Sequence, residues 1–163
     1  MNDEEYKALL FSQAENSLKP AINAYLTWLY KQIDNSLYGS KILEIGAGAG
    51  LSKNFIPERQ IQMTDYLPWE LSDVLGSVDA QRLSYPDNSF DSAFALDAIH
   101  HISNPITALS ELCRVVRPGG QIVIVEPFVS YFSYPVYKKF HIENTTWNYN
   151  LPENGKRDIN EAS

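Results

Sequence analysis

The chain of 163 residues is poor in cysteine, in positive charge and in long apolar runs. Its single cysteine, Cys113, cannot form an internal disulfide or supply a cysteine-rich zinc site. No apolar run approaches the roughly 20 residues that a membrane-spanning helix needs. The N-terminal residues MNDEEYK are acidic, whereas a secretory signal begins with positive charge. We therefore expect a protein of the cytoplasm that has no membrane partner.

Negative charge prevails, because 20 Asp and Glu stand against 13 Lys and Arg and give a formal net charge of −7. Such a surface repels the phosphate backbone of nucleic acids, so we expect no nucleic-acid partner. Hydrophobic residues make up 44% of the chain and charged residues 20%, the balance of a folded globular protein. The length fits one domain.

Helix and strand signals alternate along most of the chain. Apolar residues at helical spacing predict a helix over residues 2–18 and a second from Pro20 to the break at Gly39, which together form an N-terminal helical cap, residues 1–38. These helices either pack on the rest of the protein or cover a site as a lid. Further along, we predict strands over 41–45, 61–64, 77–83, 90–96 and 121–126, and helical segments over 50–56, 68–75 and 104–116.

The predicted strands are apolar on both faces, which is typical of a parallel sheet covered by helices on each side. The residues between the strands are long enough for right-handed helical crossovers. The sequence therefore predicts an α/β fold with a parallel sheet in residues 39–127. Residues 128–163 form a separate aromatic-rich segment, in which no strand can be assigned with assurance.

A glycine-rich loop, Glu44-Ile45-Gly46-Ala47-Gly48-Ala49-Gly50, lies between the first predicted strand of this region and a helix. Glycines at this place let the chain turn sharply and let a ligand approach the backbone. The third glycine comes one residue earlier than in the dinucleotide pattern G-x-G-x-x-G. Glu44 would repel a diphosphate and attract an ammonium or sulfonium group, so the loop favours S-adenosylmethionine over a nicotinamide dinucleotide. The alternative is that Glu44 faces solvent at the end of a strand.

An acidic residue, Asp65, ends the next predicted strand, 19 residues after Gly46. A carboxylate at about this distance from the loop can accept hydrogen bonds from ribose hydroxyls. Both S-adenosylmethionine and NAD contain this ribose, so Asp65 indicates a nucleoside without choosing between them. Its neighbour Tyr66 could pack on an adenine ring or lie exposed on the surface.

Two longer segments resemble a known family. The segments are ILEIGAGAGLS and DAQRLSYPDNSFDSAFALDAIHHISNPITALSELCRVVRPGGQIVIVEP, and the resemblance covers residues 41–127. They are similar to the methyltransferase domain of class I S-adenosylmethionine-dependent methyltransferases that act on small molecules. The resemblance implies a Rossmann-like, doubly wound sheet of about five strands in the order 3-2-1-4-5.

The resemblance also implies contacts along the whole cofactor, S-adenosylmethionine. The methionine part would be lined by Glu44, Gly46, Ala47, Gly48 and Asp97, the ribose would be held by Asp65, and the adenine would be contacted by Tyr66, Asp79 and Ala80.

The adjacent His100 and His101 raise the question of a general base. Methyl transfer from a sulfonium depends mainly on alignment, and a base is needed only where the acceptor must lose a proton. For His101 we expect a structural or cofactor-lining role, with general-base catalysis as the alternative. We expect no metal site, because adjacent histidines point in different directions and His141 has no ligand-spaced partner.

The chain also departs from the family. The family's sheet usually has seven strands, the last two forming an antiparallel hairpin, and we expect this hairpin to be missing after Glu126. The fifth strand would then have an open edge, which the last residues or a second copy of the chain would cover. The chain is either a fragment of a longer protein or a short form.

We therefore predict a methyltransferase that uses S-adenosylmethionine and a small-molecule acceptor. The first alternative is a truncated, inactive binding or regulatory module, suggested by the missing sheet edge. The second alternative is an NAD-dependent oxidoreductase, which would share the glycine loop and Asp65.

Overall fold

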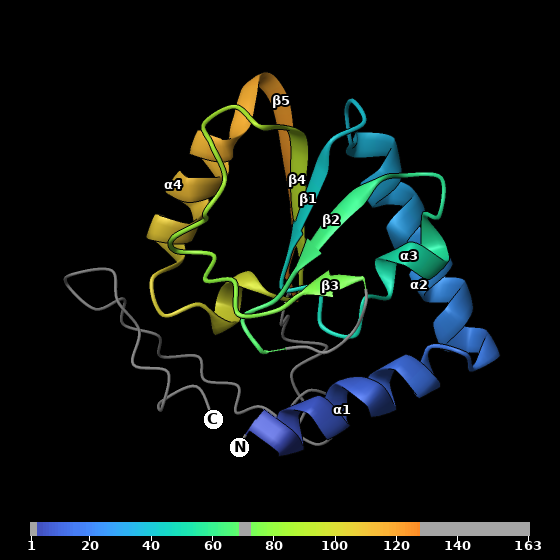
Figure 1. Cartoon of the computed structure of the whole chain (residues 1–163). Helices are drawn as coiled ribbons and strands as arrows, with labels where there is room; N and C mark the ends of the chain where they lie inside the picture. The colour runs from blue at the N-terminus through green and yellow to red at the C-terminus, as the bar shows by residue number, and fades with distance from the viewer. Residues whose placement is uncertain (1–2, 69–72, 128–163) are drawn as a thin grey trace, which may run out of the picture.

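The computed structural model describes residues 3–68 and 73–127. A five-stranded sheet of order β3-β2-β1-β4-β5 forms its centre, and all neighbouring strands are parallel (Figure 1). This arrangement confirms the predicted Rossmann-like fold. The strands are β1 (Ile42–Ile45), β2 (Ile61–Thr64), β3 (Val74–Leu75), β4 (Phe90–Leu96) and β5 (Val116–Val125). The helices are α1 (Asp3–Asn16), α2 (Pro20–Ser36), α3 (Ser52–Phe55), the 3-10 helix η1 (Ile99–His101) and α4 (Pro105–Val115).

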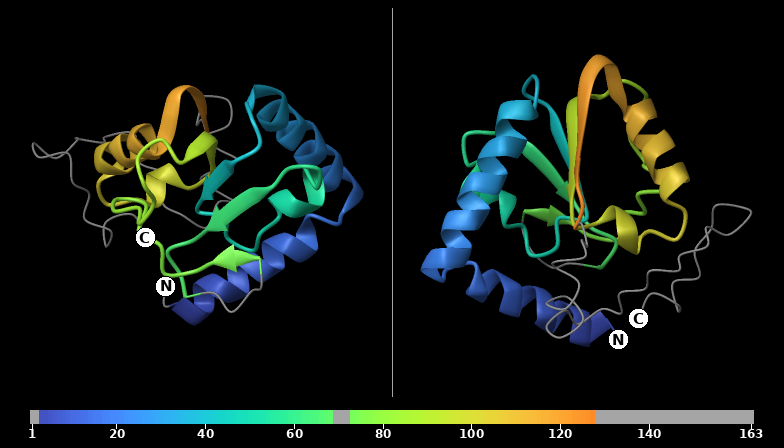
Figure 2. Two further views of the ribbon diagram at one scale, coloured as in Figure 1. Left: turned by 45° about the horizontal axis from the view of Figure 1, so that its top comes forward. Right: turned by 180° about the vertical axis from the view of Figure 1, so that it is seen from behind.

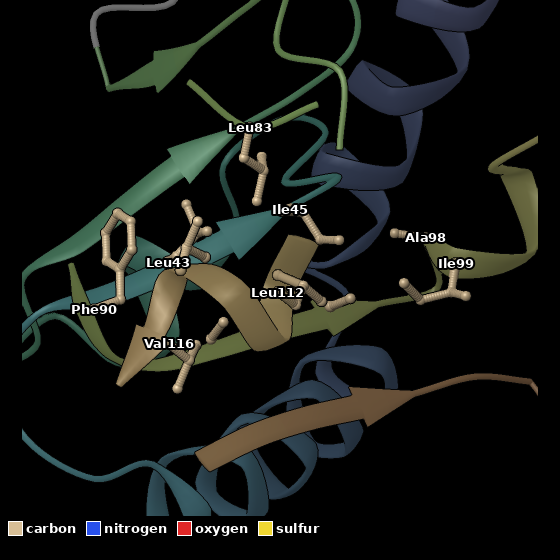
Figure 3. Packing of buried hydrophobic residues seen from close by; sticks show 11 residues of the cluster. Leu43, Ile45, Leu83, Phe90, Ala98, Ile99, Leu112 and Val116 are labelled. Carbon is tan, nitrogen blue, oxygen red and sulfur yellow. The ribbon is translucent and has the colours of Figure 1, made fainter. Parts of the chain in front are cut away.

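The sheet is covered on both faces. Helices α2 and α3 lie on one face and α4 on the other, as the opposite views in Figure 2 show. Side chains alternate between the two faces along a strand, so Ile42 of β1 packs with α2 while Leu43 packs with α4. Figure 3 shows Leu43 beside Leu112 of α4. The apolar run at β1 follows from burial of both faces.

Helix α1 covers neither face of the sheet. It crosses the end of the sheet at which the strands finish (Figure 1). The buried Leu10 of α1 reaches the glycine loop, since a Cβ on Gly48 would lie 3.4 Å from Leu10 Cδ2. Helix α2 therefore packs on a face of the sheet as predicted, and α1 lies across the end of the sheet; its role as a lid stays a prediction.

The predicted third strand, residues 77–83, is wrong. The strand that pairs with β2 is β3, Val74–Leu75, and residues 77–89 form a loop. The alternation of apolar residues that suggested a strand arises because Val78, Ala80 and Leu83 pack from this loop against the core. The prediction of a helical segment over 68–75 is wrong at its end, where β3 lies; residues 69–72 lie outside the described residues.

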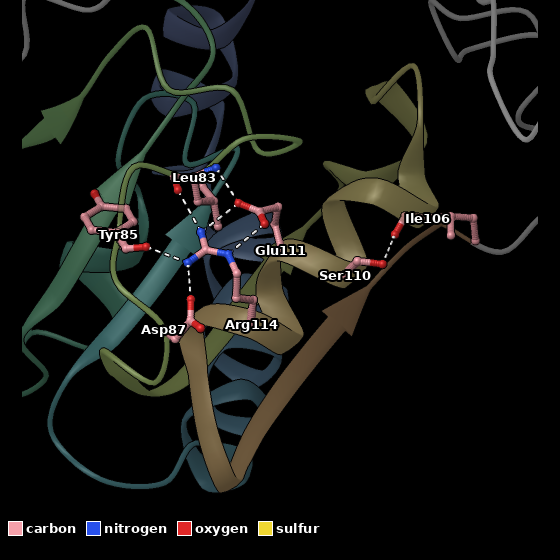
Figure 4. Close-up of polar contacts among 7 residues, drawn as sticks. All are labelled: Leu83, Tyr85, Asp87, Ile106, Ser110, Glu111 and Arg114. Carbon is pink, nitrogen blue, oxygen red and sulfur yellow. Dashed lines mark hydrogen bonds and ion pairs between the residues drawn. The ribbon is translucent and has the colours of Figure 1, made fainter.

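Two side chains of α4, Arg114 and Glu111, form hydrogen bonds with the backbone of this loop, as a neighbouring strand would do in a sheet. Arg114 donates to the backbone oxygens of Leu83 and Tyr85, each at 2.8 Å, and pairs with Asp87 at 2.8 Å (Figure 4). Glu111 accepts from the Leu83 N–H at 2.8 Å and also binds Arg114. Three backbone polar groups of the loop, the Leu83 N–H and the oxygens of Leu83 and Tyr85, are therefore satisfied without a sheet ladder.

The boundary between α4 and β5 also differs from the prediction. The helix ends at Val115 and the strand starts at the next residue, whereas we predicted a strand beginning at Gln121. The sequence Pro118-Gly119-Gly120 lies inside β5 as an irregularity, where the pairing partner shifts from Phe90↔Val116 to Ser92↔Gln121. A Cβ on Gly120 would lie 2.4 Å from the Asp91 oxygen, so this close passage requires glycine.

In the described part of the chain, β5 is at one edge of the sheet. The predictions for residues 128–163, including the absent hairpin, lie outside the described residues. Within residues 3–68 and 73–127, no helix combines the length and the apolar character needed to cross a membrane.

Two positions on α4 test the packing of the sheet against this helix. Leu112 is fully buried in the core, whereas Ile106 on the same helix is exposed. We expect Leu112→Ala to lower the free energy of unfolding by about 2–5 kcal/mol, because it leaves a cavity. The matched control, Ile106→Ala, should change it by less than about 0.5 kcal/mol. Urea unfolding followed by circular dichroism measures both, and equal effects would contradict the packing described.

Candidate functional site

Four acidic residues lie at the carboxyl ends of four strands, at the same end of the sheet. Because the strands are parallel, the chain leaves β1, β2, β4 and β5 at one edge, and the crevice at this edge is where open α/β sheets bind ligands. The glycine loop follows β1 and includes Glu44 of the strand itself. Asp65 follows β2, Asp97 follows β4 and Glu126 follows β5.

The glycine loop has the sharp turn that its sequence predicts. Gly46, Gly48 and Gly50 have φ angles of +67°, +53° and +73°, in the left-handed region that favours glycine. A Cβ on Gly46 would lie 2.4 Å from the Ala98 Cβ, so this loop touches the segment that follows β4. The Ala47 N–H donates to the Thr64 oxygen at 2.9 Å and ties the loop to β2.

Glu44 lies beneath this loop with 2% of its surface exposed. The alternative that it faces solvent is therefore wrong. Its carboxylate accepts a hydrogen bond of 2.5 Å from Ser52 Oγ, in the first turn of α3. Burial raises the pKa of Glu44 from 4.5 to about 7; the Ser52 hydrogen bond opposes this rise, and the charge of Asp65 adds to it. Among the described residues, no Lys or Arg forms an ion pair with Glu44.

Tyr30 of α2 borders the same acidic region. Its pKa is raised, first by burial and then by the negative charges of Glu44 and Asp97. The phenol therefore stays neutral and adds no further negative charge to this region. A buried carboxylate without a cation is costly, so this site is complementary to a ligand that carries positive charge.

Asp65 is 7% exposed and holds the loop itself. One carboxylate oxygen accepts from the Gly48 N–H at 2.8 Å, and the other accepts from the Leu67 N–H at 2.9 Å. A carboxylate has about four acceptor positions, so both oxygens keep capacity for ribose hydroxyls. Sequence reasoning predicted the ribose contact and missed the hydrogen bond that shapes the loop.

The residues predicted for the adenine lie near the loop that follows β3. Asp79 accepts from the Gln81 N–H at 2.8 Å, which turns the chain there, and Ala80 is half-buried against the core. Tyr66 is 74% exposed, so nothing in the described part of the chain covers most of its ring. All three roles in adenine binding stay predictions.

The segment after β4 carries the last predicted residues. Asp97 has a φ of +51°, unusual for a residue other than glycine, and its N–H donates to the Val125 oxygen at 2.9 Å. His101 is exposed, and its ring lies 4.0 Å from the ring of His100 between centroids.

Two residues of this region were missed by sequence reasoning. Ser52 binds Glu44, and Glu126 contacts His100. A signal for Glu126 was present, since it follows an apolar strand in the same way as Asp65. No local pattern marks Ser52, because its importance depends on the burial of Glu44.

With this geometry, comparison with known families gives the class of the protein. The family described as "Methyltransferase domain" matches residues 43–124, half of the chain. The chain belongs to this family, and the match confirms the class predicted from the sequence, an S-adenosylmethionine-dependent methyltransferase domain. The oxidoreductase alternative is not supported by it.

Several curated methyltransferases are similar over this region. A phosphatidylethanolamine N-methyltransferase of Cereibacter sphaeroides is 30% identical over 55% of this chain and 52% of its own length. A ubiquinone/menaquinone biosynthesis C-methyltransferase of Bdellovibrio bacteriovorus is 32% identical over 50% of this chain and 35% of its own. The chain thus spans about half or less of the curated relatives it matches.

Solved structures support the fold. The YcgJ protein of Bacillus subtilis has a TM-score of 0.51 at 25% identity, over 69% of this chain and 54% of its own. A Methanococcus maripaludis protein assigned to the S-adenosylmethionine-dependent methyltransferases has a TM-score of 0.62 at 17% identity, over 82% of this chain and 72% of its own, and shows the fold alone.

The burial of Glu44 predicts an unusual pH dependence of stability. Because its pKa is higher in the folded than in the unfolded chain, the folded protein binds more protons between pH 4.5 and about 7, and stability falls as pH rises through this range. Removing the charge with Glu44→Gln should raise the free energy of unfolding at pH 8 by about 1–3 kcal/mol, with no gain below pH 4.5. Urea unfolding at several pH values measures this.

Glu58→Gln serves as the control for this series, because Glu58 is exposed. A loss of stability at pH 8 on Glu44→Gln, or the same pH profile in both variants, would show that the Glu44 carboxylate is compensated within the protein.

Proposed function

We propose that this chain is the cofactor-binding core of an enzyme that transfers the methyl group of S-adenosylmethionine to a small organic acceptor. The observation that carries the proposal is the burial of Glu44 beneath the glycine loop with no described Lys or Arg paired to it. S-adenosylmethionine carries positive charge on its sulfonium and its ammonium, and either group suits this carboxylate better than a diphosphate does.

In this proposal the residues of the loop hold the methionine part of the cofactor, and the residues after β2 and β3 hold the nucleoside. Gly46, Ala47, Gly48 and Asp97 line the methionine part with Glu44; Asp65 binds the ribose; Tyr66, Asp79 and Ala80 contact the adenine. The bound cofactor supplies a methyl group already activated by a positively charged sulfur.

The contribution of the chain is then alignment and exclusion of water. Alignment of two reactants can supply about 7–11 kcal/mol of the barrier reduction. The residues present suit this task, because the loop is fixed at two backbone N–H groups and a side chain of α1, Leu10, lies against it. A dry site also strengthens the interaction of Glu44 with a cationic ligand.

The finer features of the function belong to the same proposal. Curated relatives act on phosphatidylethanolamine, quinone precursors and a rifamycin, so we infer a small acceptor with extended apolar parts. The net charge of −7 argues against a nucleic-acid partner, the single cysteine suits a cytoplasmic protein, and the lack of long apolar runs argues against a membrane partner. We further infer the division into 1–38, 39–127 and 128–163, and a second copy of the chain that covers the edge of β5.

Calorimetric titration with S-adenosylhomocysteine at pH 8 tests the cofactor site. This ligand keeps the ammonium of the cofactor, so we expect binding by the native chain and binding weaker by about 10–100-fold in Glu44→Gln, because a charge-assisted hydrogen bond is lost. Glu58→Gln should bind like the native chain. Urea unfolding of Glu44→Gln at the same pH shows whether the variant is folded, so that unfolding can be separated from loss of the ligand contact.

No heat from the native chain at high micromolar S-adenosylhomocysteine would contradict the proposed function. Binding of NAD with affinity equal to that of S-adenosylhomocysteine would also contradict it.

A further inference from the structure

A tyrosine of α2, Tyr30, is buried beside the acidic crevice. It is 3% exposed, and its ring stacks on the ring of Phe55 in α3, with the centroids 5.0 Å apart and the planes inclined by 4°. Within residues 3–68 and 73–127, the Tyr30 hydroxyl forms no hydrogen bond. Buried hydroxyl groups are nearly always hydrogen-bonded, because an unsatisfied one costs free energy. The hydroxyl of Tyr30 therefore requires an explanation.

The direction of α2 points this side chain toward the carboxyl ends of the strands. Helix α2 ends at Ser36, and the chain then enters β1 at Ile42, so the helix runs toward the amino end of the sheet and begins nearer its carboxyl end (Figure 1). Side chains of a helix lean toward the start of the helix. The ring of Tyr30 therefore extends toward the end of the sheet that carries the glycine loop.

The surroundings of Tyr30 agree with this direction. Its apolar cluster includes Leu51, which directly follows the glycine loop, and Leu96, which directly precedes Asp97. Burial, and after it the charges of Glu44 and Asp97, raise the pKa of Tyr30, so the hydroxyl lies within electrostatic reach of both carboxylates. The phenol is thus a neutral donor at the border of an acidic site, held in place by its stacked ring.

The amino-acid part of the proposed cofactor carries two opposite charges, an ammonium and a carboxylate. Glu44 and Asp65 suit the ammonium and repel the carboxylate. Among the described residues no Lys or Arg pairs with either acid. The carboxylate of the ligand therefore needs a hydrogen-bond donor, and the O–H of a tyrosine is one.

We propose that Tyr30 is a cofactor-binding residue whose hydroxyl donates a hydrogen bond to the carboxylate of the methionine part of S-adenosylmethionine. This inference rests on the proposed function. Glu44 binds the ammonium and Tyr30 the carboxylate, so two elements of the fold, β1 and α2, hold the two ends of one amino-acid group. Holding both ends restricts the position of the sulfur between them, which contributes to alignment of the methyl group.

A neutral donor suits this position better than a cation would. A Lys or Arg beside Glu44 would neutralise its charge within the protein and weaken the attraction for the ammonium. A phenol leaves the charge of Glu44 available and still binds the carboxylate. The choice of residue at position 30 therefore follows from the charge of its neighbour.

The variant Tyr30→Phe keeps the ring and its stack on Phe55 and removes only the hydroxyl. We expect its urea-unfolding midpoint without ligand to equal or exceed that of the native chain, because no described hydrogen bond is lost. Tyr25→Phe is the matched control, since Tyr25 lies on the same helix and is exposed. A lower midpoint in Tyr30→Phe alone would show that the hydroxyl stabilises the fold, and would overturn the proposal.

Calorimetric titration at pH 8 with three probes tests the contact itself. S-adenosylhomocysteine carries the ammonium and the carboxylate, its decarboxylated analogue keeps the ammonium alone, and methylthioadenosine lacks both. We expect Tyr30→Phe to bind S-adenosylhomocysteine about 10–100-fold more weakly and to bind the other two probes like the native chain, because only the first has the group that Tyr30 contacts. Glu44→Gln should instead weaken the binding of both ammonium-bearing probes, and Tyr25→Phe should change none.

Infrared spectroscopy of the bound ligand gives a readout that does not depend on the analogues. The probe is S-adenosylhomocysteine labelled with carbon-13 at its carboxylate. We expect the frequency of the labelled carboxylate stretch to differ between the complexes of the native chain and Tyr30→Phe, and to be the same in the native and Tyr25→Phe complexes. A hydrogen bond to the carboxylate changes this frequency, whereas a loss of packing elsewhere does not.

The possible failures are distinguishable. Native-like binding of S-adenosylhomocysteine by Tyr30→Phe, an equal loss of affinity for its decarboxylated analogue, or an unchanged carboxylate frequency would overturn the role of Tyr30 and leave the cofactor site in place. Failure of the native chain to bind S-adenosylhomocysteine would instead contradict the proposed function.

Discussion

The burial of one carboxylate, Glu44, constrains the rest of the site. An ionised carboxylate removed from water loses several kcal/mol of hydration unless hydrogen bonds or a cation replace the water. Here the protein provides one short hydrogen bond from Ser52 and places further negative charge nearby, at Asp65. The ionised Glu44 carboxylate therefore lowers the stability of the folded protein. Such a charge is typical of a functional site in which a bound ligand supplies the opposite charge.

The surrounding loop depends on the same end of the sheet. Three glycines in left-handed conformations let the backbone double back over Glu44, and contacts to β2 and to the segment after β4 fix its path. The parallel order of the strands brings the ends of β1, β2 and β4 together, although they lie far apart in the sequence. Local flexibility of glycine and long-range strand pairing are both needed for this shape.

The features that could be predicted from the sequence are those that local chemistry determines. The mostly apolar run before Gly46 predicts a strand buried on both faces. A glycine-rich loop between a strand and a helix is typical of a site where a ligand approaches the backbone. The extent of β3 could not be predicted, because the pattern at Val78 and Ala80 reports burial of a loop, which Arg114 and Glu111 hold from a distant helix. The contact between His100 and Glu126 joins residues 26 positions apart, and only the pairing of β4 with β5 brings them together.

The two hydrogen bonds that Asp65 accepts, from the Gly48 and Leu67 N–H groups, limit which substitutions this position can tolerate. Its carboxylate holds the Gly48 N–H, and so the path of the glycine loop, from the position expected to meet the ribose. An exchange of this aspartate for a neutral or longer residue would distort the loop whichever nucleoside the crevice receives. Asp65 is therefore constrained by the shape of the loop as well as by the ligand. Changes that alter ligand specificity are better tolerated at exposed neighbours such as Tyr66.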